Sequence, residues 1–429
     1  MSRFLFVLSS LFSPLYASAA VPADSSLLVR EVIIQGNRVT RESVILREMI
    51  LRPGAELTQE AIDRDRDRIY NLGLFNRVDV DSTVRGRDAV VLVTVSERWY
   101  IFPFPIIGFR HRDVKKLYYG LGFAHQNFRG RNEKLWISFA LGYDQWVTMN
   151  YENPRITDGG DLYLNASMSY QQTHSLGTSN GEYLNRTAAG YLTLGERFGF
   201  YQTAYITAGF ETWQVSQFVP GRTASASGRD AFGSLGIRYR YDTRNIREYA
   251  TAGSFLGLAL VKSGMKGNAV DLMSAGLDAR TYVPLGDDYA VGFRTMSNLI
   301  WGGEIPQYRR SSFGYDERVR GYFNNRTESD DQLLASAELR IPIIHPRTIE
   351  TSIIRIPQFQ TLRYGLYAGV FADAARSWNR NDHLMTGPWL AGAGAGLHLL
   401  LPYGATLRAE YAMNDRGIGE VFLDLGASF

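Results

Sequence analysis

Residues 362–374 have the sequence LRYGLYAGVFADA, in which one set of alternate positions is apolar throughout. This apolar set consists of Leu362, Tyr364, Leu366, Ala368, Val370, Ala372 and Ala374. The other set consists of Arg363, Gly365, Tyr367, Gly369, Phe371 and Asp373. Because successive side chains of a β-strand point to opposite faces, the stretch predicts a strand with one apolar and one mixed face.

The same alternation recurs from about residue 98 to the end of the chain. In residues 332–341 the two faces are Leu333, Ala335, Ala337, Leu339 and Ile341 against Gln332, Ser336, Glu338 and Arg340. Segments of about ten residues, separated by Gly, Asn and Asp clusters, are typical of a transmembrane β-barrel with a polar interior. Counting them gives about sixteen strands, and bacterial single-chain barrels have even numbers. The alternative is a soluble β-sandwich, in which the apolar faces would form the core.

The N-terminus has the features of a secretory signal peptide. Arg3 supplies a positive charge, residues 4–15 are largely apolar, and Ala17-Ser18-Ala19 is a small-residue cleavage site. We therefore expect residues 1–20 to direct the chain out of the cytoplasm. No later segment approaches the run of about twenty apolar residues that a membrane-spanning helix requires.

The composition excludes several classes of protein. The 429 residues contain no cysteine, which excludes disulfides, zinc–thiolate sites and cysteine nucleophiles. The net charge of +3 is too small to indicate a nucleic-acid partner. The 6 histidines have no metal-binding spacing and no nearby partner pattern. We expect no metal and no cofactor.

Residues 26–97 predict a small soluble domain with the element order β-α-α-β-β. Strands are expected over residues 28–34, 78–84 and 89–95, where apolar side chains alternate. We expect Thr40 to cap the first helix and Thr58 the second, and Gly73 to end the second helix in a left-handed conformation.

The second of these helices carries the charged run Arg64-Asp65-Arg66-Asp67-Arg68. A binding site is one interpretation of such a run. We favour a solvated helix face, because its opposite charges lie three or four residues apart and can pair along the helix.

These features resemble the outer-membrane assembly superfamily of BamA, TamA and the two-partner secretion transporters. In the small domain, the segments that resemble its periplasmic POTRA module are Gly36-Asn37, Thr40, residues 47–49 and residues 70–75. In the second region, the matching segments are residues 241–244 (YDTR), Val319-Arg320-Gly321-Tyr322 and Phe371-Ala372-Asp373. The alternating end of the chain, with Phe429 as its last residue, resembles the C-terminal insertion signal of the family.

The resemblance implies an outer-membrane β-barrel over residues 98–429 and one periplasmic POTRA domain over residues 26–97. It implies a non-enzymatic assembly or translocation factor, which captures unfolded clients with the POTRA domain and inserts or exports them through the barrel and its lateral seam. The expected partners are unfolded outer-membrane or secreted proteins, outer-membrane lipids, and periplasmic chaperones or accessory lipoproteins.

In this family, the loop that carries the Val319–Tyr322 motif folds back into the barrel lumen. Here that loop lies between the eleventh and twelfth predicted strands, and Phe371 and Asp373 lie on the inward face of a later strand. A guanidinium inside the barrel needs a carboxylate of matching fork geometry, and we expect Asp373 to supply it for Arg320. Gly392, Gly394 and Gly396 share one face and would leave room for the loop. The alternative is a solvated Arg320 and glycines that only kink a strand.

The first predicted barrel strand, residues 100–109, contains Pro103 and Pro105. Residues two apart present their backbone groups to the same neighbour, and two missing donors are tolerated mainly at a sheet edge. We hypothesise that these prolines face the terminal strand, which ends at Phe429, and weaken the seam so that client strands can pair there. The alternative is that residues 98–110 are a linker and the barrel begins near Lys116.

Two other functional classes are open to test. Residues 177–181 (GTSNG) match the G-x-S-x-G string of hydrolases, but they lie in a polar loop, whereas a nucleophile elbow needs a strand before it and a helix after it. A barrel-embedded hydrolase could still assemble a site from distant strands. A passive pore would keep its lumen open and would need no POTRA domain.

Overall fold

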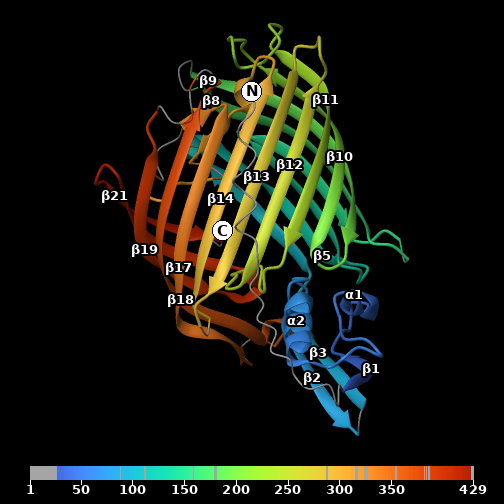
Figure 1. Ribbon diagram of the computed structural model, residues 1–429. Coiled ribbons are helices and arrows are strands. Elements are labelled where there is room, and N and C mark those ends of the chain that lie inside the picture. The colour runs from blue at the N-terminus through green and yellow to red at the C-terminus, as the bar shows by residue number, and fades with distance from the viewer. Residues whose placement is uncertain are drawn as a thin grey trace, which may run out of the picture.

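The computed structural model describes residues 27–426 except 87, 111–112, 158, 178–180, 287, 315–316, 323–326, 353–354, 381, 383 and 385–386. It contains a small N-terminal domain below a large rolled sheet (Figure 1). The expected signal peptide (residues 1–20) and Phe429 lie outside the described residues.

The N-terminal domain is a three-stranded sheet packed against two helices. Its elements are β1 (Leu28–Gln35), α1 (Glu42–Leu46), α2 (Gln59–Tyr70), β2 (Phe75–Arg85) and β3 (Asp88–Glu97). The strand order is β1-β3-β2, with β1 parallel and β2 antiparallel to β3. Its core includes Val29, Ile45, Met49, Leu51, Ile69, Leu74, Phe75, Val91 and Val93. The predicted order of elements is therefore confirmed.

The cap predictions were right for one helix and wrong for the other. The Thr58 hydroxyl accepts a hydrogen bond from the Ala61 amide at 3.1 Å, and Gly73 has a φ of 72°. Thr40 does not cap α1, whose N-cap is Arg41. The Thr40 hydroxyl instead lies 3.0 Å from the Tyr100 hydroxyl and accepts a hydrogen bond from Asn127 Nδ2 at 2.9 Å. All three residues are buried, and buried polar groups need a hydrogen-bond partner.

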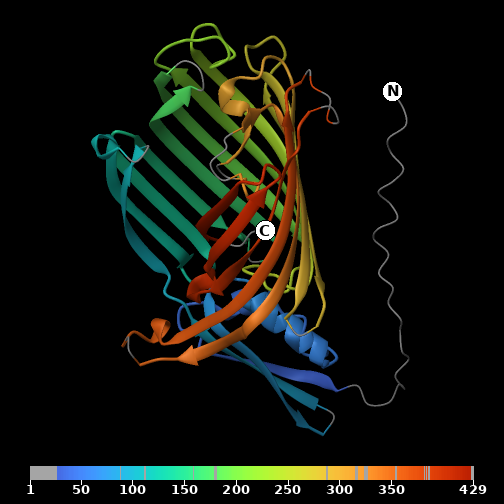
Figure 2. The same cartoon turned by 90° about the vertical axis from the view of Figure 1, so that its left-hand side faces the viewer.

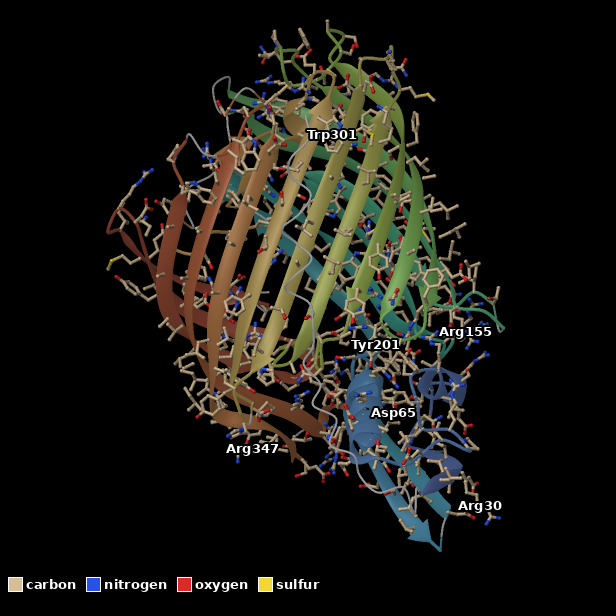
Figure 3. All side chains as sticks on the ribbon, in the orientation of Figure 1. Arg30, Asp65, Arg155, Tyr201, Trp301 and Arg347 are labelled. Carbon is tan, nitrogen blue, oxygen red and sulfur yellow. The ribbon has the colours of Figure 1, made fainter. Side chains whose placement is uncertain are left out.

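The interpretation of the charged run on α2 as a solvated face is wrong at Asp65. This carboxylate is fully buried and accepts the backbone amides of Ile50 at 2.8 Å and Leu51 at 2.9 Å. Arg68 also binds it at 2.6 Å. Figure 3 places Asp65 on α2, below Tyr201 at the rim of the barrel. A local charge pattern could not reveal this role, because the two amides come from the segment before the helix.

The barrel is one sheet of sixteen antiparallel strands, as the alternation predicted. The strands are β4 (Ile101–Phe109), β5 (Leu117–Phe128), β6 (Glu133–Gly142), β7 (Gln145–Asn153), β8 (Leu162–Gly177), β9 (Gly181–Phe198), β10 (Gln202–Val215), β11 (Arg229–Asp242), β12 (Gly253–Gly264), β13 (Asp271–Pro284), β14 (Ala290–Gly302), β17 (Asp331–Glu350), β18 (Thr361–Trp378), β19 (Leu390–Leu400), β20 (Thr406–Asn414) and β21 (Gly419–Leu425). Each pairs with its neighbours in chain order. A short hairpin of β15 (Ser311–Phe313) and β16 (Thr327–Ser329) lies between β14 and β17.

The two faces of each barrel strand have the predicted chemistry. In β20 the apolar Leu407 and Tyr411 are exposed, whereas Arg408 and Glu410 are buried. The same reversal holds along β18, where Val370 is exposed and Asp373 is buried. Apolar side chains therefore cover the outside of the cylinder, which contradicts the sandwich alternative. Among the residues with described positions, no helix is long and apolar enough to span a membrane.

Replacing Asp65 by alanine is expected to destabilise the N-terminal domain by about 2–3 kcal/mol, because two buried amides lose their acceptor. Pulse proteolysis of the full chain in increasing urea measures this change. The control is Asp63→Ala on the same helix, which removes a half-exposed ion pair and should cost under about 0.5 kcal/mol. Equal effects of the two substitutions would contradict the structural role of Asp65.

Candidate functional site

The loop between β14 and β17 lies inside the barrel. Its residues Phe313, Val319 and Tyr322 are buried in one apolar cluster. The barrel contributes inward-facing side chains to this cluster, namely Met296, Leu334, Ala375 and Leu390. This loop lies between the eleventh and twelfth strands in chain order, the position predicted for it.

The structure brings Arg320 and Asp373 together at the centre of this interface. Arg320 Nε donates to one carboxylate oxygen at 2.8 Å and Nη2 to the other at 2.7 Å, while the Arg320 amide donates at 3.0 Å. Its third nitrogen, Nη1, donates to Glu338 Oε2 at 2.7 Å and lies 3.7 Å from Glu410 Oε1. The guanidinium lies 3.7 Å above the centre of the Phe371 ring. Two buried charge-assisted contacts and an aromatic face thus replace the water that Arg320 loses.

Glycines on both partners permit this close approach. Gly321 has a φ of 96°, in the left-handed region, and its carbonyl accepts from Asn414 Nδ2 at 2.9 Å. On β19, a side chain at Gly392 would overlap the carbonyl oxygen of Arg320, as expected. A side chain at Gly394 or Gly396 would first meet β20 and not the loop, at the Tyr411 carbonyl oxygen or at Glu410. The structure therefore places Gly392 directly beneath the loop.

Other loop residues extend the contact to the final strand. Glu317 binds Arg294 of β14 at 2.8 Å. The Tyr322 hydroxyl donates to Asp415, next to the end of β20. Arg318 lies 3.3 Å from Asp424 of β21. The loop is therefore tied both to the strand that precedes it and to the last strand of the barrel.

A second segment reaches the same network from the opposite end of the barrel. This is the turn between β11 and β12, residues 243–252, which follows Asp242. The Tyr249 hydroxyl lies 2.7 Å from His398 Nδ1, and His398 Nε2 lies 2.9 Å from Glu410 Oε1. Arg340 donates to the carbonyl of Ala250 at 2.5 Å. Glu410 thus faces both Arg320 and His398.

The role of His398 was not predicted from the sequence, because its partners lie on another strand and in the turn. The ligand atoms of Glu338, His398 and Glu410 lie within 4.8 Å of one another, close enough to suggest a metal site. The oxygens of Glu338 already bind Arg320 and Arg340, and both nitrogens of His398 already have partners. The arrangement fits an ion-pair network better than a cation site.

The N-terminal domain docks on the rim of the barrel through its helices. Glu48 accepts two hydrogen bonds from Arg197 at the end of β9, at 2.6 and 2.7 Å. The Arg68 guanidinium lies 3.7 Å above the Phe200 ring. Asn71 binds the turn 243–252, donating to the carbonyl of Asn245 at 2.6 Å. This turn therefore contacts both the docked domain and the buried network.

Burial raises the pKa of Glu48, but the two hydrogen bonds from Arg197 and the nearby positive charges outweigh it, and the net pKa lies below the ordinary value. Docking of the N-terminal domain on the barrel therefore favours the ionised form of the Glu48 carboxyl group. A second contact in the same interface joins Arg98 Nη2 to Glu248 Oε1 at 3.0 Å.

The two edges of the barrel sheet are β4 and β21, and no hydrogen-bonded pairing joins them among the described residues. In Figure 2 the red C-terminal strands and the blue-green first strands stand on the two sides of an opening. The linker alternative for residues 98–110 is wrong, because β4 pairs with β5 along its whole length.

The backbone nitrogens of Pro103 and Pro105 lie on the side of β4 that faces this open edge. The Gln126 amide donates to the Tyr100 carbonyl at 2.8 Å, so the even-numbered positions of β4 face β5 and the odd-numbered positions face away from it. The Trp99 indole donates to the Ile101 carbonyl, which also lies on the odd-numbered side. The edge toward β21 therefore lacks two amide donors and has one carbonyl already bound.

The G-x-S-x-G string does not form a nucleophile elbow. Gly177 and Gly181 are paired residues at the adjoining ends of β8 and β9, so the string joins two strands and no helix follows it. Residues 178–180 lie outside the described part of the chain.

Comparison with known proteins gives consistent matches. The model of the Omp85 superfamily domain matches residues 127–429, and the POTRA model, described as a surface antigen variable number repeat, matches residues 27–98. The outer membrane protein assembly factor BamA of Nitratidesulfovibrio vulgaris (strain Hildenborough) is 21% identical over 304 residues, which cover 68% of this chain and 37% of that protein. The chain thus spans well under half the length of this relative.

Two solved structures resemble the chain. CdiB from Escherichia coli has a TM-score of 0.57 at 11% identity, over 94% of this chain and 75% of that one. BamA from Haemophilus ducreyi lacking POTRA domains 1–3 has a TM-score of 0.54 at 19% identity, over 94% of this chain and 84% of that one. At these identities the likeness shows a shared fold.

Replacing Arg320 by alanine is expected to release the loop and to raise the steady conductance of the purified protein in planar bilayers. The substitution leaves Asp373 buried without Arg320 and removes one of the two cations that bind Glu338, which costs about 3–5 kcal/mol. The matched control is Arg310→Ala, which removes a more exposed arginine of the same loop. Conductance that is the same in both variants and in the parent would show that Arg320 does not hold the loop in the lumen.

Acid is expected to loosen the docked domain. Because the pKa of Glu48 is lowered by docking, its contribution is complete above its ordinary pKa of about 4.3 and is lost as the pH falls through the lowered value. Glu48→Gln should have the same effect at neutral pH, at a cost of about 2 kcal/mol. The distribution of distances between spin labels attached at Ser82→Cys and Leu285→Cys should then broaden. The control Glu42→Gln, an exposed carboxylate on α1, should keep the narrow distribution.

Proposed function

Because this chain belongs to the Omp85 superfamily, with an outer-membrane β-barrel and a periplasmic POTRA domain, we propose that it inserts or translocates client polypeptides. The clients are unfolded outer-membrane or secreted proteins, received from periplasmic chaperones or accessory lipoproteins. The POTRA domain is assigned to residues 26–97 and the barrel to residues 98–429. The observation that carries the proposal is the seam between β4 and β21, the two edges of the barrel sheet, which no ladder of hydrogen bonds joins within the described part of the chain.

Capture of a client would begin at β2. This strand is an edge of the POTRA sheet, because among the described strands it pairs with β3 alone. Its first residues face the barrel, since Asn76 Nδ2 donates to the Gln358 carbonyl at 2.6 Å. The later residues, Asp81 to Val84, are exposed. An extended client segment can add there through main-chain hydrogen bonds, which do not depend on its side-chain sequence.

Transfer to the membrane would use the seam. An unpaired strand edge is a template for another strand, and β21 presents Val421, Leu423 and Leu425 as highly exposed apolar side chains beside it. The prolines of β4 remove two donors from the facing edge, so that pairing of β4 with β21 is weaker than pairing in the remaining ladder. A client strand that pairs with β21 therefore competes with an incomplete partner.

The passive-pore alternative requires an open lumen. The buried loop of Val319–Tyr322 fills part of the interior of this barrel, and it is held by a charge network rather than by a single contact. The hydrolase alternative has no support from the G-x-S-x-G string, which joins two strands. Outer-membrane protein assembly or translocation remains the function that the geometry supports best.

Locking the seam is expected to stop client insertion or secretion. The absence of cysteine allows Phe104→Cys on β4 to be paired with Phe422→Cys on β21 without a background signal. Crosslinking of the two, scored by a mobility shift that reductant reverses, should abolish activity, and reduction should restore it. The control pair, Phe104→Cys with Gly122→Cys, joins β4 to its ordinary neighbour β5 at directly paired positions and should leave activity intact. Full activity with a completely locked seam would rule out transfer through it.

A further inference from the structure

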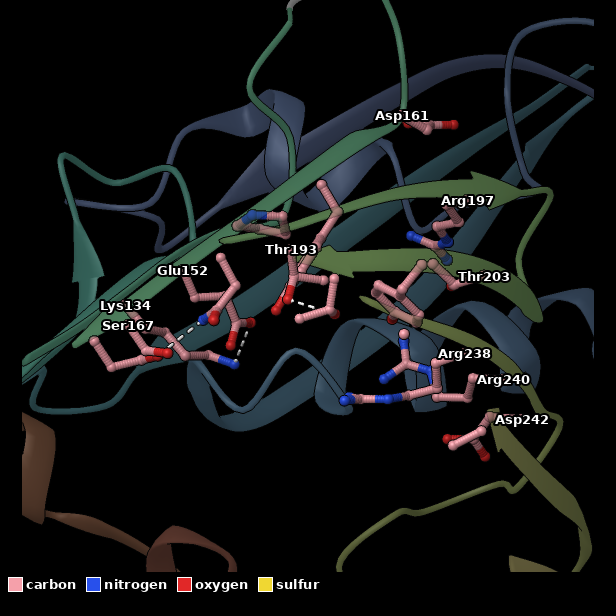
Figure 4. A pocket seen from close by; sticks show the side chains of 18 of the residues that line it. Lys134, Glu152, Asp161, Ser167, Thr193, Arg197, Thr203, Arg238, Arg240 and Asp242 are labelled. Carbon is pink, nitrogen blue, oxygen red and sulfur yellow. Dashed lines mark hydrogen bonds and ion pairs between the residues drawn. The ribbon is translucent and has the colours of Figure 1, made fainter. Parts of the chain in front are cut away.

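A cavity of about 900 Å³ lies inside the barrel at the end that faces the POTRA domain. Its walls are the inward faces of strands from β6 to β12 and the ends of the POTRA helices. It is distinct from the Arg320 network, which is built on β17 to β20. Figure 4 shows Arg238 and Arg240 side by side on one wall, with Thr193, Thr203 and Ser167 on the others.

The lining of this cavity is cationic. Of its residues, 9 are arginine or lysine and 5 are aspartate or glutamate, a difference of 9 − 5 = 4 positive charges. The nearest contacts of the carboxylates are Glu48 to Arg197 at 2.6 Å, Glu152 to Lys134 at 3.2 Å, Asp161 to Arg155 at 3.9 Å, Glu211 to Arg309 at 2.6 Å and Asp242 to Arg244 at 2.9 Å. Every carboxylate of the lining therefore already has a cationic partner.

Arg238 and Arg240 are left without a carboxylate among the described residues. Each guanidinium instead lies near the Tyr205 ring, with its central carbon 6.0 and 5.9 Å from the ring centre. Arg238 is exposed even though its position on β11 faces the lumen, so water and solutes reach it. Two accessible guanidiniums in a partly enclosed site attract anions more strongly than the same groups on an open surface.

The spacing of the two arginines indicates the shape of the anion. They are alternate residues of one strand, so their Cα atoms are about 7 Å apart along it. Side chains on one face of an extended polypeptide repeat at the same distance. Ser167 lines the same cavity and is half-buried, so its hydroxyl group can bind the peptide backbone.

We propose that this cavity binds extended acidic segments of polypeptide, with carboxylates at alternate positions paired to Arg238 and Arg240. The inference rests on the proposed function, since it names the class of client sequence that the lumen accepts beside the POTRA domain. The site retains acidic stretches at the entrance of the barrel while neutral stretches pass over it.

Binding of synthetic peptides to the purified full chain tests this proposal. A fluorescent peptide of alternating Glu and Ser is titrated by anisotropy, beside an alternating Gln and Ser peptide. The acidic peptide should bind and the neutral one should not. Arg238→Gln with Arg240→Gln should weaken binding roughly tenfold or more, because two charge-assisted contacts are lost. The control Arg186→Gln with Arg229→Gln removes two exposed arginines outside the cavity and should have no effect.

A charge-reversal variant distinguishes loss of the binding site from loss of folding. Arg238→Glu with Arg240→Glu should lose the acidic peptide and gain binding of an alternating Lys and Ser peptide, which a misfolded chain cannot do. Undiminished binding of the acidic peptide by the Gln variant would overturn the proposal. So would tighter binding of tripolyphosphate than of the peptide at the same arginines, which would assign the cavity to phosphate groups.

The same variants separate this inference from the proposed function. A chain that handles clients in the insertion or secretion assay but does not bind the acidic peptide overturns only the inference. A chain that binds the peptide through Arg238 and Arg240 but handles no client overturns only the proposed function.

Discussion

The burial of one guanidinium organises the interior of this barrel. Arg320 comes from a loop, yet it binds carboxylates on β17 and β18 and lies close to a third on β20. A buried charge without partners is far more costly than a buried pair, so the loop and these strands stabilise one another only when all are in place. Gly392 of β19 belongs to the same constraint, because a side chain there would occupy the space of the loop backbone.

The turn between β11 and β12 is a second segment that contacts this network. Its Tyr249 contacts His398 inside the barrel. Its Asn245 contacts Asn71 of the POTRA domain, and its Glu248 contacts Tyr70 of that domain and Arg98, which directly follows it. The turn therefore makes hydrogen bonds both to the docked domain and to the network around Arg320. Loop and turn enter from opposite ends of the barrel and meet at Glu410, which faces both Arg320 and His398.

Charged side chains are paired differently on the two sides of the barrel interior. Carboxylates of β17, β18 and β20 surround Arg320 of the buried loop. Strands β6 to β12 surround the open cationic cavity, so charge is neutralised on one side of the barrel and left accessible on the other. The seam lies where β21, which contacts the loop through Arg318 and Asp424, meets the proline-bearing edge of β4. A polypeptide in the lumen would thus meet the seam, the loop and the cationic wall within one enclosure.

Several features were predictable from the amino-acid sequence: the inward and outward faces of the strands, the strand number, the POTRA element order, the cap at Thr58 and the candidate pair Arg320 and Asp373. These properties follow from a period of two, from a residue's immediate neighbours, or from motifs matched to a family. Four features could be seen only in the folded chain: Glu338 also binds Arg320, His398 bridges Tyr249 and Glu410, Asp65 is buried, and no carboxylate of the described part of the chain pairs with Arg238 or Arg240. The physical reason is that closing the sheet brings together side chains far apart in the chain, and alternation states which way a side chain points but not what it meets.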